Sequence, residues 1–464
     1  MTLTDKEIRQ SLFKNFSPQE QVPIGPEHLF YVPLFPEGDD PILQMQESIG
    51  FTEHSSMQLF SGCRGSGKTT QLRRLAELLE SDGYIVVTVD ALDYFNPAQP
   101  IDAREIPIVL GAMLSEAMEA DDKLGRDPSR EGFLTRFVNL LNNTNVTLDE
   151  LGGKVGANTG IVPGGSVETN FKLKFRTTQS FREQIGKLLS GLDREARAAC
   201  HKYFEETRAE LIAKHPRTKG LVFILDAFEQ LRGDVTNSAK VIESVLHLFT
   251  QHEDLLQLPC WKAIYTVPPW LHIAYPGCIN HACFLPTLKL WKFAEPPLPQ
   301  ERHEPSWETM RKIVAHRIGL DEIDRVFPPG EDGHNPVMDH LIEFSGGHIR
   351  DLFLLITKCV LSSTTLPFKM ETAGRAVFSL ADSMPITDRD SLYLRDVRAN
   401  RSRCLPDRET ETVTRFAQLT DFHLILEFRN GKAWFDIHPA IREAVETTAR
   451  QTDADPRRLE AARR

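Results

Sequence analysis

The sequence has no long apolar run. Of its 464 residues 41% are hydrophobic, yet no stretch of about 18 consecutive apolar residues occurs, as a membrane-spanning helix requires. The first ten residues, MTLTDKEIRQ, also lack the basic and then apolar pattern of a secretory leader. We therefore expect no membrane span and no signal peptide, and we expect the protein to act in the cytoplasm.

The chain has seven cysteines and fewer basic than acidic residues, 54 Lys and Arg against 65 Asp and Glu. The seven cysteines are scattered and odd in number, which favours a reducing compartment over a disulfide framework. A net charge of −11 argues against nucleic-acid binding through bulk electrostatics, because neutralising phosphates requires clustered Lys and Arg. A local basic patch and a solvated linker both remain open as interpretations of one arginine cluster: Arg395, Arg398, Arg401, Arg403 and Arg408.

Three glycines mark a phosphate-binding motif. Residues 62–69 read GCRGSGKT and match the phosphate-loop pattern G-x-x-x-x-G-K-[ST] at every fixed position. Such a loop wraps a polyphosphate with backbone N–H groups, and glycine permits the positive φ values and the close approach. Lys68 is expected to reach the β- and γ-phosphates and Thr69 to bind Mg²⁺; the alternative is a plain glycine-rich turn. The predicted nucleotide contacts are Gly62, Cys63, Arg64, Gly65, Ser66, Gly67, Lys68, Thr69 and Thr70.

The residues around this loop predict a β-α-β unit. An apolar strand precedes it, residues 68–80 carry one apolar helical face, and residues 84–90 form a β-branched run typical of a buried parallel strand. The first fifty residues contain six prolines, so we expect them to run extended across the nucleotide domain.

Two further strands are expected to carry site residues. The run LVFILD at 221–226 ends in Asp226, which is placed to reach the Mg²⁺ shell. Residues 261–268 predict another core strand with Thr266 near its carboxyl end, where ligands of open α/β sheets bind. Thr266 could sense the γ-phosphate, or its hydroxyl could be satisfied locally.

Outside these strands the chain is mostly helical in pattern. Residues 104–143 and 179–214 predict helices, whereas apolar residues alternate with polar ones from Val167 to Phe175 and predict a strand or hairpin on a glycine-rich stalk. That element is either a mobile partner-binding hairpin or an ordinary edge hairpin. Four more helices are expected at 306–318, 336–344, 347–363 and 368–381. Residues 405–450 read helix, strand, Asn430-Gly431 turn, strand, helix, which predicts a winged helix.

The predicted fold class is α/β: a phosphate-loop NTPase parallel sheet sandwiched by helices, then an α-helical lid and a C-terminal winged-helix domain. The expected parts, in chain order, are an extended segment at 1–50, the ATPase core at 51–295 with an insert at 121–216, the lid at 296–385, the winged-helix domain at 386–450 and a tail at 451–464.

Taken in order, these motifs resemble the AAA+ and STAND group of phosphate-loop ATPases, especially the branch shared by origin-recognition initiators and bacterial STAND-like regulators. The resemblance covers most of the chain. The segments that carry it are GCRGSGKTT at 62–70, LVFILDAFEQL at 221–231, AIYTVP at 263–268, SGGHIRDL at 345–352 and WFDIHPAIREAV at 434–445.

The resemblance implies roles for three further residues. Arg350 would be the lid arginine that reaches the nucleotide phosphates, unless it forms a surface salt bridge at a helix start. His438 would contact the ADP β-phosphate, although Pro439 replaces the usual Asp and an interface histidine without a ligand is an equal alternative. Ala227 stands where many relatives have an acid. Glu229 could orient water if the strand continues that far, and hydrolysis would be slow if it does not.

We therefore expect an ATP- and ADP-binding switch with Mg²⁺ as cofactor and weak ATP hydrolysis, with Lys68, Asp226, Glu229, Thr266 and Arg350 as catalytic candidates. The expected partners are further copies of the chain, a separate effector protein, or both, and the resemblance implies a role in bacterial defence or signalling. The alternative is a DNA-binding initiator or regulator that uses its winged helix. A small-molecule kinase is disfavoured because residues 300–450 look regulatory.

Overall fold

The computed structural model describes residues 3–17, 24–53, 55–120, 124, 130–142, 167–234, 236–274, 282–295, 300–331, 333–402, 409–430 and 432–463. The chain divides into two compact units. One comprises residues 1–41, 62–74 and 284–464 and is called the lid unit here; the other comprises residues 42–61 and 75–283 and is called the sheet unit.

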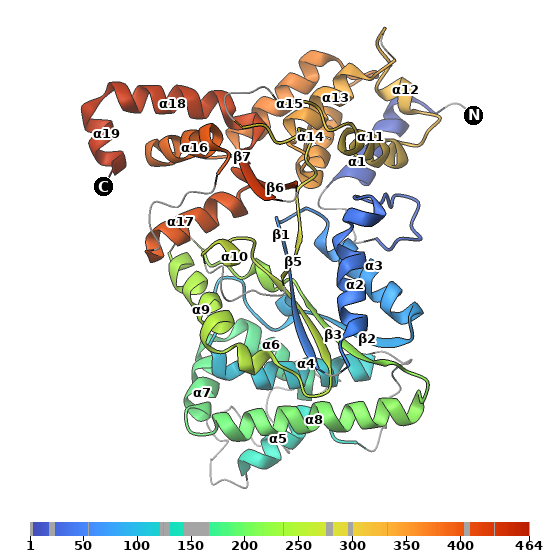
Figure 1. Ribbon diagram of the computed structural model, residues 1–464, viewed down its shortest axis with the longest axis vertical. Helices are drawn as coiled ribbons and strands as arrows, with labels where there is room; N and C mark the ends of the chain where they lie inside the picture. The colour runs from blue at the N-terminus through green and yellow to red at the C-terminus, as the bar shows by residue number, and fades with distance from the viewer. Residues whose placement is uncertain are drawn as a thin grey trace. The chain divides into compact units, whose positions relative to one another are not determined.

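A five-stranded sheet forms the centre of the sheet unit. Its strand order is β2-β3-β4-β1-β5, with β1 (Ser56–Gly62) parallel to β4 (Lys262–Val267), and β3 (Gly220–Asp226) parallel to both β4 and β2 (Tyr84–Asp90); β5 is Ala282–Leu285. The strands run between α2 (Pro41–Phe51) and α9 (Ser238–Gln251) (Figure 1). The expected parallel sheet with flanking helices is confirmed.

The position of β2 in the sheet differs from the expectation of a buried strand. Because β2 lies at the edge, Val87 is the one residue of this strand that is buried, whereas β4 is buried along its whole length. A β-branched run indicates that a segment suits a strand, but the order of strands decides how much of it is covered.

Aromatic side chains pack the sheet against its helices. Phe204, in α8 (Asp193–Lys214), meets Phe223 of β3 and Trp261 edge to face, with ring centroids 5.7 and 5.5 Å apart. The indole of Trp261 also donates a hydrogen bond to the Phe204 carbonyl at 3.1 Å. The predicted helical stretches are present as α4 (Ile106–Ala120), α5 (Phe133–Asn142), α7 (Gln179–Leu189) and α8.

The strand or hairpin expected from Val167 to Phe175 is wrong. These residues belong to helix α6 (Val167–Thr177), and the glycine-rich stalk before it lies outside the described residues. The rings of Phe171 and Phe175, four residues apart, stack at 5.3 Å, and Phe175 is fully buried. The alternating pattern also contains this i, i+4 pair, and packing of Phe175 selects the helix.

The extended segment expected at 1–50 is also wrong in part. Helix α1 (Asp5–Phe16) begins at Thr4 with a capping box in which the Glu7 side chain accepts from the Thr4 backbone. Ile8, Leu12 and Phe16 form a buried stripe at four-residue spacing. The prolines lie after this helix, and Pro41 occupies the first position of α2, where its missing N–H costs nothing.

In the lid unit, helices occur close to their predicted places, as α11 (Glu304–Ile318), α13 (Pro336–Phe344), α14 (Ile349–Ser362) and α15 (Met370–Asp382), with the short α12 (Ile323–Val326) between the first two. Helix α1 packs on α14, where the rings of Phe16 and Phe353 lie edge to face at 5.5 Å.

The C-terminal part contains the expected pair of strands between two helices. Helices α16 (Asp388–Asn400) and α17 (Thr410–Asp421) precede the antiparallel strands β6 (Ile425–Asn430) and β7 (Lys432–Ile437), and α18 (Arg442–Ala454) follows. Phe428 and Trp434 stack across the hairpin with centroids 4.5 Å apart. The expected tail is helical, because α18 continues into it and α19 (Pro456–Arg463) follows. Among the described residues, no helix has the length and apolarity to cross a bilayer.

Candidate functional site

The phosphate loop, residues 62–69, joins β1 to α3 (Lys68–Ser81). Gly65 and Gly67 have φ of +83° and +95°, values that side chains other than glycine adopt only with strain. The Ser66 hydroxyl donates to the Cys63 carbonyl at 2.8 Å, which tightens the turn. The Lys68 ammonium lies in the first turn of α3 and donates to the carbonyls of Gly62 and Cys63 at 3.0 and 3.1 Å. The fold of the loop is thus the one its motif predicts.

The start of helix α14 lies against this loop, within the lid unit. A Cβ placed on Gly65 would be 2.7 Å from Arg350 Cβ and 3.0 Å from its Nε, so the arginine side chain covers the loop at this glycine. His348 Nε2 donates to the Arg64 carbonyl at 2.6 Å. The structure therefore places Arg350 beside the loop that the sequence predicts it to serve.

Two glycines make this approach of α14 possible. Gly346 and Gly347 have φ of +63° and +81°. A Cβ on Gly347 would be 1.8 Å from the Leu288 carbonyl oxygen, a backbone atom that cannot yield. The Gly-Gly pair before His348 is therefore required by both the backbone conformation and the space around it.

Asp226 ends strand β3 in the sheet unit and is buried, with its Oδ1 accepting the Ala227 N–H at 2.7 Å. The chain then turns at once, because Ala227 has φ of +64° and residues 228–230 form a 3₁₀ turn. The strand does not continue to Glu229, so the strand geometry considered for Glu229 is wrong. Its role as the residue that positions water stays a prediction.

Thr266 is fully buried in β4, and its hydroxyl accepts the Phe228 N–H at 2.9 Å. This bond supports the alternative in which the threonine is satisfied locally, where it holds the turn after β3. Asp226, Glu229 and Thr266 belong to the sheet unit, whereas the phosphate loop, Arg350 and His438 belong to the lid unit.

One acidic residue at the strand ends was missed from the sequence. Asp90 ends β2 directly beside Asp226 in the parallel register. Desolvation raises the pKa of Asp90, and the nearby carboxylates of Asp93 and Glu229 raise it further, against the hydrogen bond from the Leu92 N–H. The sequence contained the same signal that identified Asp226, because Asp90 is an acidic residue at the end of the apolar run YIVVTVD.

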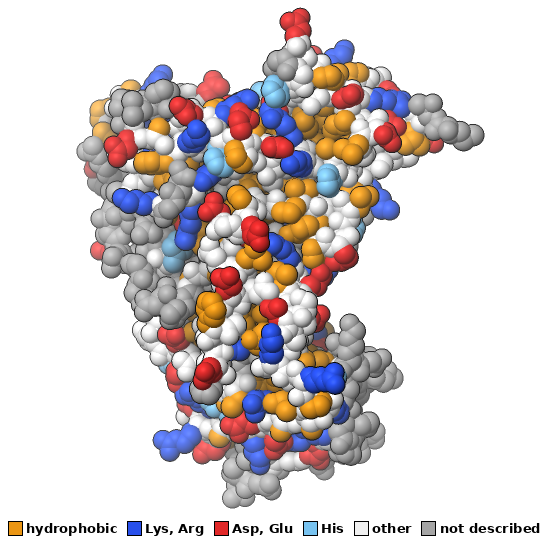
Figure 2. Space-filling view, turned by 45° about the vertical axis from the view of Figure 1, so that its right-hand side comes forward, with side chains coloured by type: hydrophobic (Ala, Val, Ile, Leu, Met, Phe, Trp, Pro, Cys, Tyr) orange, Lys and Arg blue, Asp and Glu red, His pale blue; other side chains and the backbone are white. Residues whose placement is uncertain are grey.

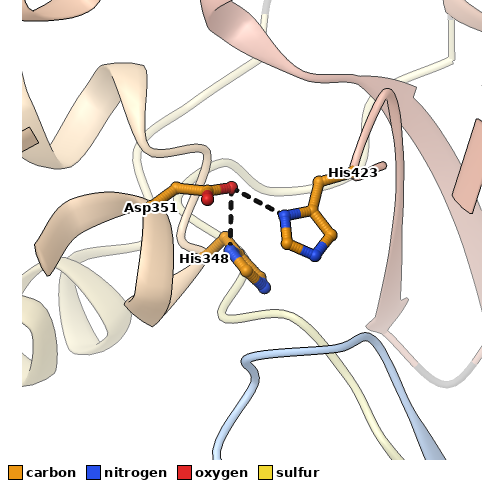
Figure 3. Close-up of side chains that lie close together, drawn as sticks. All are labelled: His348, Asp351 and His423. Carbon is orange, nitrogen blue, oxygen red and sulfur yellow. Dashed lines mark hydrogen bonds and ion pairs between the residues drawn. The ribbon is translucent and has the colours of Figure 1, made fainter. Parts of the chain in front are cut away.

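His438 lies in a buried cluster of ionisable side chains. Its Nδ1 accepts the Ala440 N–H at 3.2 Å, and its Nε2 lies 3.4 Å from Asp351 Oδ2. The same oxygen lies 2.8 Å from His348 Nδ1 and 3.1 Å from His423 Nδ1 (Figure 3). This arrangement supports the interpretation of His438 as an interface histidine, and Asp351 and His423 were not anticipated.

Burial and neighbouring charge act on this cluster in opposite directions. Burial alone would raise the pKa of Asp351, but the three histidines around it hold that pKa well below its usual range. Burial lowers the pKa of His423 to about 4 and His348 lowers it further, against the hydrogen bond with Asp351, which acts to raise it.

The described arginines that were considered for nucleic-acid binding pair with acidic residues of the lid unit. Arg395 Nη1 lies 2.5 Å from Asp453 Oδ2, and Arg398 Nη1 lies 3.6 Å from Glu446 Oε1. Arg401 forms an ion pair with Asp436. Arg403 and Arg408 lie outside the described residues. On the face drawn in Figure 2, basic and acidic side chains are interspersed.

Neither a protein-family model nor a curated protein sequence matches this chain. Among the solved structures to which it is similar is the ORC2 protein of Aeropyrum pernix in ADPNP–ADP complexes, at 11% identity over 92% of this chain and 99% of that one, with a TM-score of 0.39. A Walker-type ATPase of Pyrococcus abyssi is 12% identical over 91% and 100%, with a TM-score of 0.36. Cdc6p of Pyrobaculum aerophilum is 11% identical over 94% and 98%, also at 0.36.

Proposed function

We propose that this chain is a nucleotide-dependent switch that binds ATP with Mg²⁺ and hydrolyses it slowly. The observation that carries the proposal is the approach of α14 to the phosphate loop, where Arg350 covers Gly65 and His348 holds the Arg64 carbonyl. A guanidinium at this place can bind phosphate oxygens bidentately, so bound nucleotide would bias the position of the lid helix.

Each candidate residue has a defined task in this proposal. Lys68 and the loop amides would hold the phosphates, and the nine predicted contacts from Gly62 to Thr70 would form the binding surface. Thr69 and Asp226 would hold Mg²⁺, which supplies charge neutralisation of the phosphates. Arg350 would respond to the γ-phosphate. Thr266 would support the turn that follows Asp226, since its hydroxyl bonds the Phe228 amide.

The conformation of the chain after Asp226 supports slow turnover. The residue after Asp226 is Ala227, whose side chain cannot act as a general base. The chain also leaves the strand at Ala227. Glu229 is the remaining acid in this segment. ADP could then persist long enough to define a second state, and His438 would act indirectly through Asp351. Assembly with other copies or an effector, and a role in bacterial defence or signalling, are the biological extension of this proposal.

Nucleotide content and steady-state ATP hydrolysis of the purified protein test the proposal. Lys68→Ala removes a charged donor and should weaken ATP binding about 10- to 100-fold. Glu229→Gln should leave binding unchanged and remove the residual turnover. Lys240→Ala, an exposed lysine of α9, is the matched control for the loss of a lysine. Wild-type protein that binds ATP no better than Lys68→Ala would contradict the proposal, as would identical size-exclusion profiles in ATP and ADP for the switch itself.

A further inference from the structure

The cluster around Asp351 joins three separate segments of the lid unit. His348 and Asp351 lie at the start of α14, His423 lies between α17 and β6, and His438 precedes α18. All four residues are buried, with exposed fractions between 0 and 8%. The ligand atoms of His348, Asp351 and His423 lie within 4.8 Å of one another. Such a concentration of ionisable groups in a protein interior requires a compensating interaction.

The proton positions on His348 follow from its partners. A carbonyl oxygen can only accept, so Nε2, at 2.6 Å from the Arg64 carbonyl, carries a proton. In the neutral ring Nδ1 then presents a lone pair. This atom is buried, lies 2.8 Å from Asp351 Oδ2, and forms no hydrogen bond with any described atom. A lone pair beside a carboxylate oxygen is repulsive unless positive charge lies between them.

Two sources of positive charge can be distinguished by geometry. A second proton on His348 would make Nδ1 a donor, and its N–H would then point at the carboxylate in a hydrogen bond. The contact at 2.8 Å lacks that alignment, because Nδ1 forms no hydrogen bond there. When two atoms ligate the same cation, each directs a lone pair at the cation and not at the other atom. The hydrogen-bond angle between Nδ1 and Oδ2 therefore need not be favourable.

His438 has a different role from the other two histidines. Its Nδ1 accepts the Ala440 N–H at 3.2 Å, so the proton of the neutral ring is on Nε2, which faces Asp351 Oδ2 at 3.4 Å. An imidazole held in this tautomer cannot ligate a metal through Nε2. It can donate toward a ligating carboxylate, which is the outer-shell arrangement that orients metal ligands. His423 Nδ1 is also hydrogen-bonded to Asp351 Oδ2, at 3.1 Å, but its Nε2 has no hydrogen-bond partner among the described residues. The proton of His423 can therefore move to Nε2, which frees Nδ1 for a metal.

We propose that His348 Nδ1, His423 Nδ1 and Asp351 Oδ2 bind one divalent transition-metal ion, for which Zn²⁺ is the best match. Two imidazoles and one carboxylate suit Zn²⁺ and its neighbours in the transition series, whereas Mg²⁺ and Ca²⁺ prefer oxygen ligands throughout. With metal–ligand bonds of about 2.0–2.1 Å, tetrahedral ligand atoms stand about 3.3 Å apart, so the two contacts to Asp351 Oδ2, now at 2.8 and 3.1 Å, would lengthen by a few tenths of an ångström. Three protein ligands leave a fourth position for water.

The ion would connect the start of α14 to the segment that leads into β6. His348 and Asp351 come from α14 and His423 from the turn before β6, so a common ion ties these elements together. The other nitrogen of His348 donates to the Arg64 carbonyl, which is the arrangement in which a second hydrogen bond fixes a ligating ring. Metal binding is thereby linked to the phosphate loop, and it does not depend on the proposed nucleotide chemistry.

Zinc binding to the full-length protein tests this site. Protein with Cys260→Ser, which removes an exposed thiol, is stripped with chelator and titrated with Zn²⁺ against a chromophoric competitor. We expect one tightly bound Zn²⁺ per chain and a higher Tm in its presence. His423→Gln should weaken binding at least tenfold, and His438→Gln about 10- to 100-fold as an outer-shell change. His247→Gln, on the exposed face of α9, is the control and should bind like the parent.

A second measurement decides the question if a variant fails to fold. Co²⁺ added to the stripped parent protein should give visible d–d absorption that saturates at one equivalent and is displaced by Zn²⁺. Absence of stoichiometric Co²⁺ and Zn²⁺ binding by the parent would overturn the proposal. The cluster would then be a metal-free network of histidines hydrogen-bonded to Asp351. Equal affinity of folded His423→Gln and His247→Gln would overturn it as well, because the zinc would then be bound elsewhere.

Discussion

At the scale of single residues, burial decides what the chemistry of the phosphate loop can be. Cys63 is 2% exposed and faces Thr287 within the lid unit. Desolvation raises the pKa of its thiol to about 11, and the carboxylate of Glu427 adds to this effect. The thiolate is the reactive form of cysteine, so we expect Cys63 to be unreactive although it lies in the phosphate loop.

Alkylation at pH 8 checks this prediction. A thiol with a pKa of about 11 is thiolate to about 0.1% at pH 8, roughly 200-fold less than an ordinary cysteine, and the fraction rises as pH rises towards 11. Peptide mapping after brief iodoacetamide treatment should therefore find Cys260 modified and Cys63 intact, with Cys63 labelled only in denaturant. Modification of both at similar rates in the folded protein would contradict the burial of the loop.

At the scale of elements, the Gly-Gly turn before α14 sets where the lid helix meets the phosphate loop. Gly347→Ala places a methyl group 1.8 Å from the Leu288 carbonyl oxygen, at a φ of +81°. The turn must therefore open, and we expect a loss of about 2–4 kcal/mol in the free energy of unfolding. Thermal unfolding followed by circular dichroism measures this loss.

Gly374 in α15 provides the matched control for that change. A methyl group there meets open space, so Gly374→Ala should stabilise the helix by about 0.5–1 kcal/mol. An equal effect of the two substitutions would show that the turn before α14 tolerates a side chain. The contact of His348 with Arg64 would then need another explanation.

At the scale of the whole molecule, charge argues against DNA as the partner. The net charge is −11, and the described arginines of the 395–408 cluster already pair with Asp453, Glu446 and Asp436. Since binding to duplex DNA depends on neutralising phosphates, we expect a Kd weaker than about 10 μM even at low salt. Fluorescence anisotropy with labelled duplex measures it, and tight binding that weakens steeply with added salt would favour the DNA-binding alternative.

Local sequence determined the parts of the fold that depend on neighbours in the chain. The phosphate loop, its strand and its helix follow from residues within one stretch, because glycine conformations and helix periodicity are local properties. The hairpin of β6 and β7 and the helices of the lid follow for the same reason. Helix α1 is also specified locally, by its capping box, although a proline-rich stretch follows it.

Tertiary structure decided the features that depend on burial and on contacts between residues distant in the sequence. The pairing of Phe171 with Phe175 and the burial of Phe175 chose helix over strand for α6, which the alternating pattern did not distinguish. The cluster of His348, Asp351, His423 and His438 has no motif, since its members come from the start of α14, the turn before β6 and the turn after β7. The sequence by itself determined that this protein has a phosphate loop; only the packing of side chains distant in sequence decided what surrounds it.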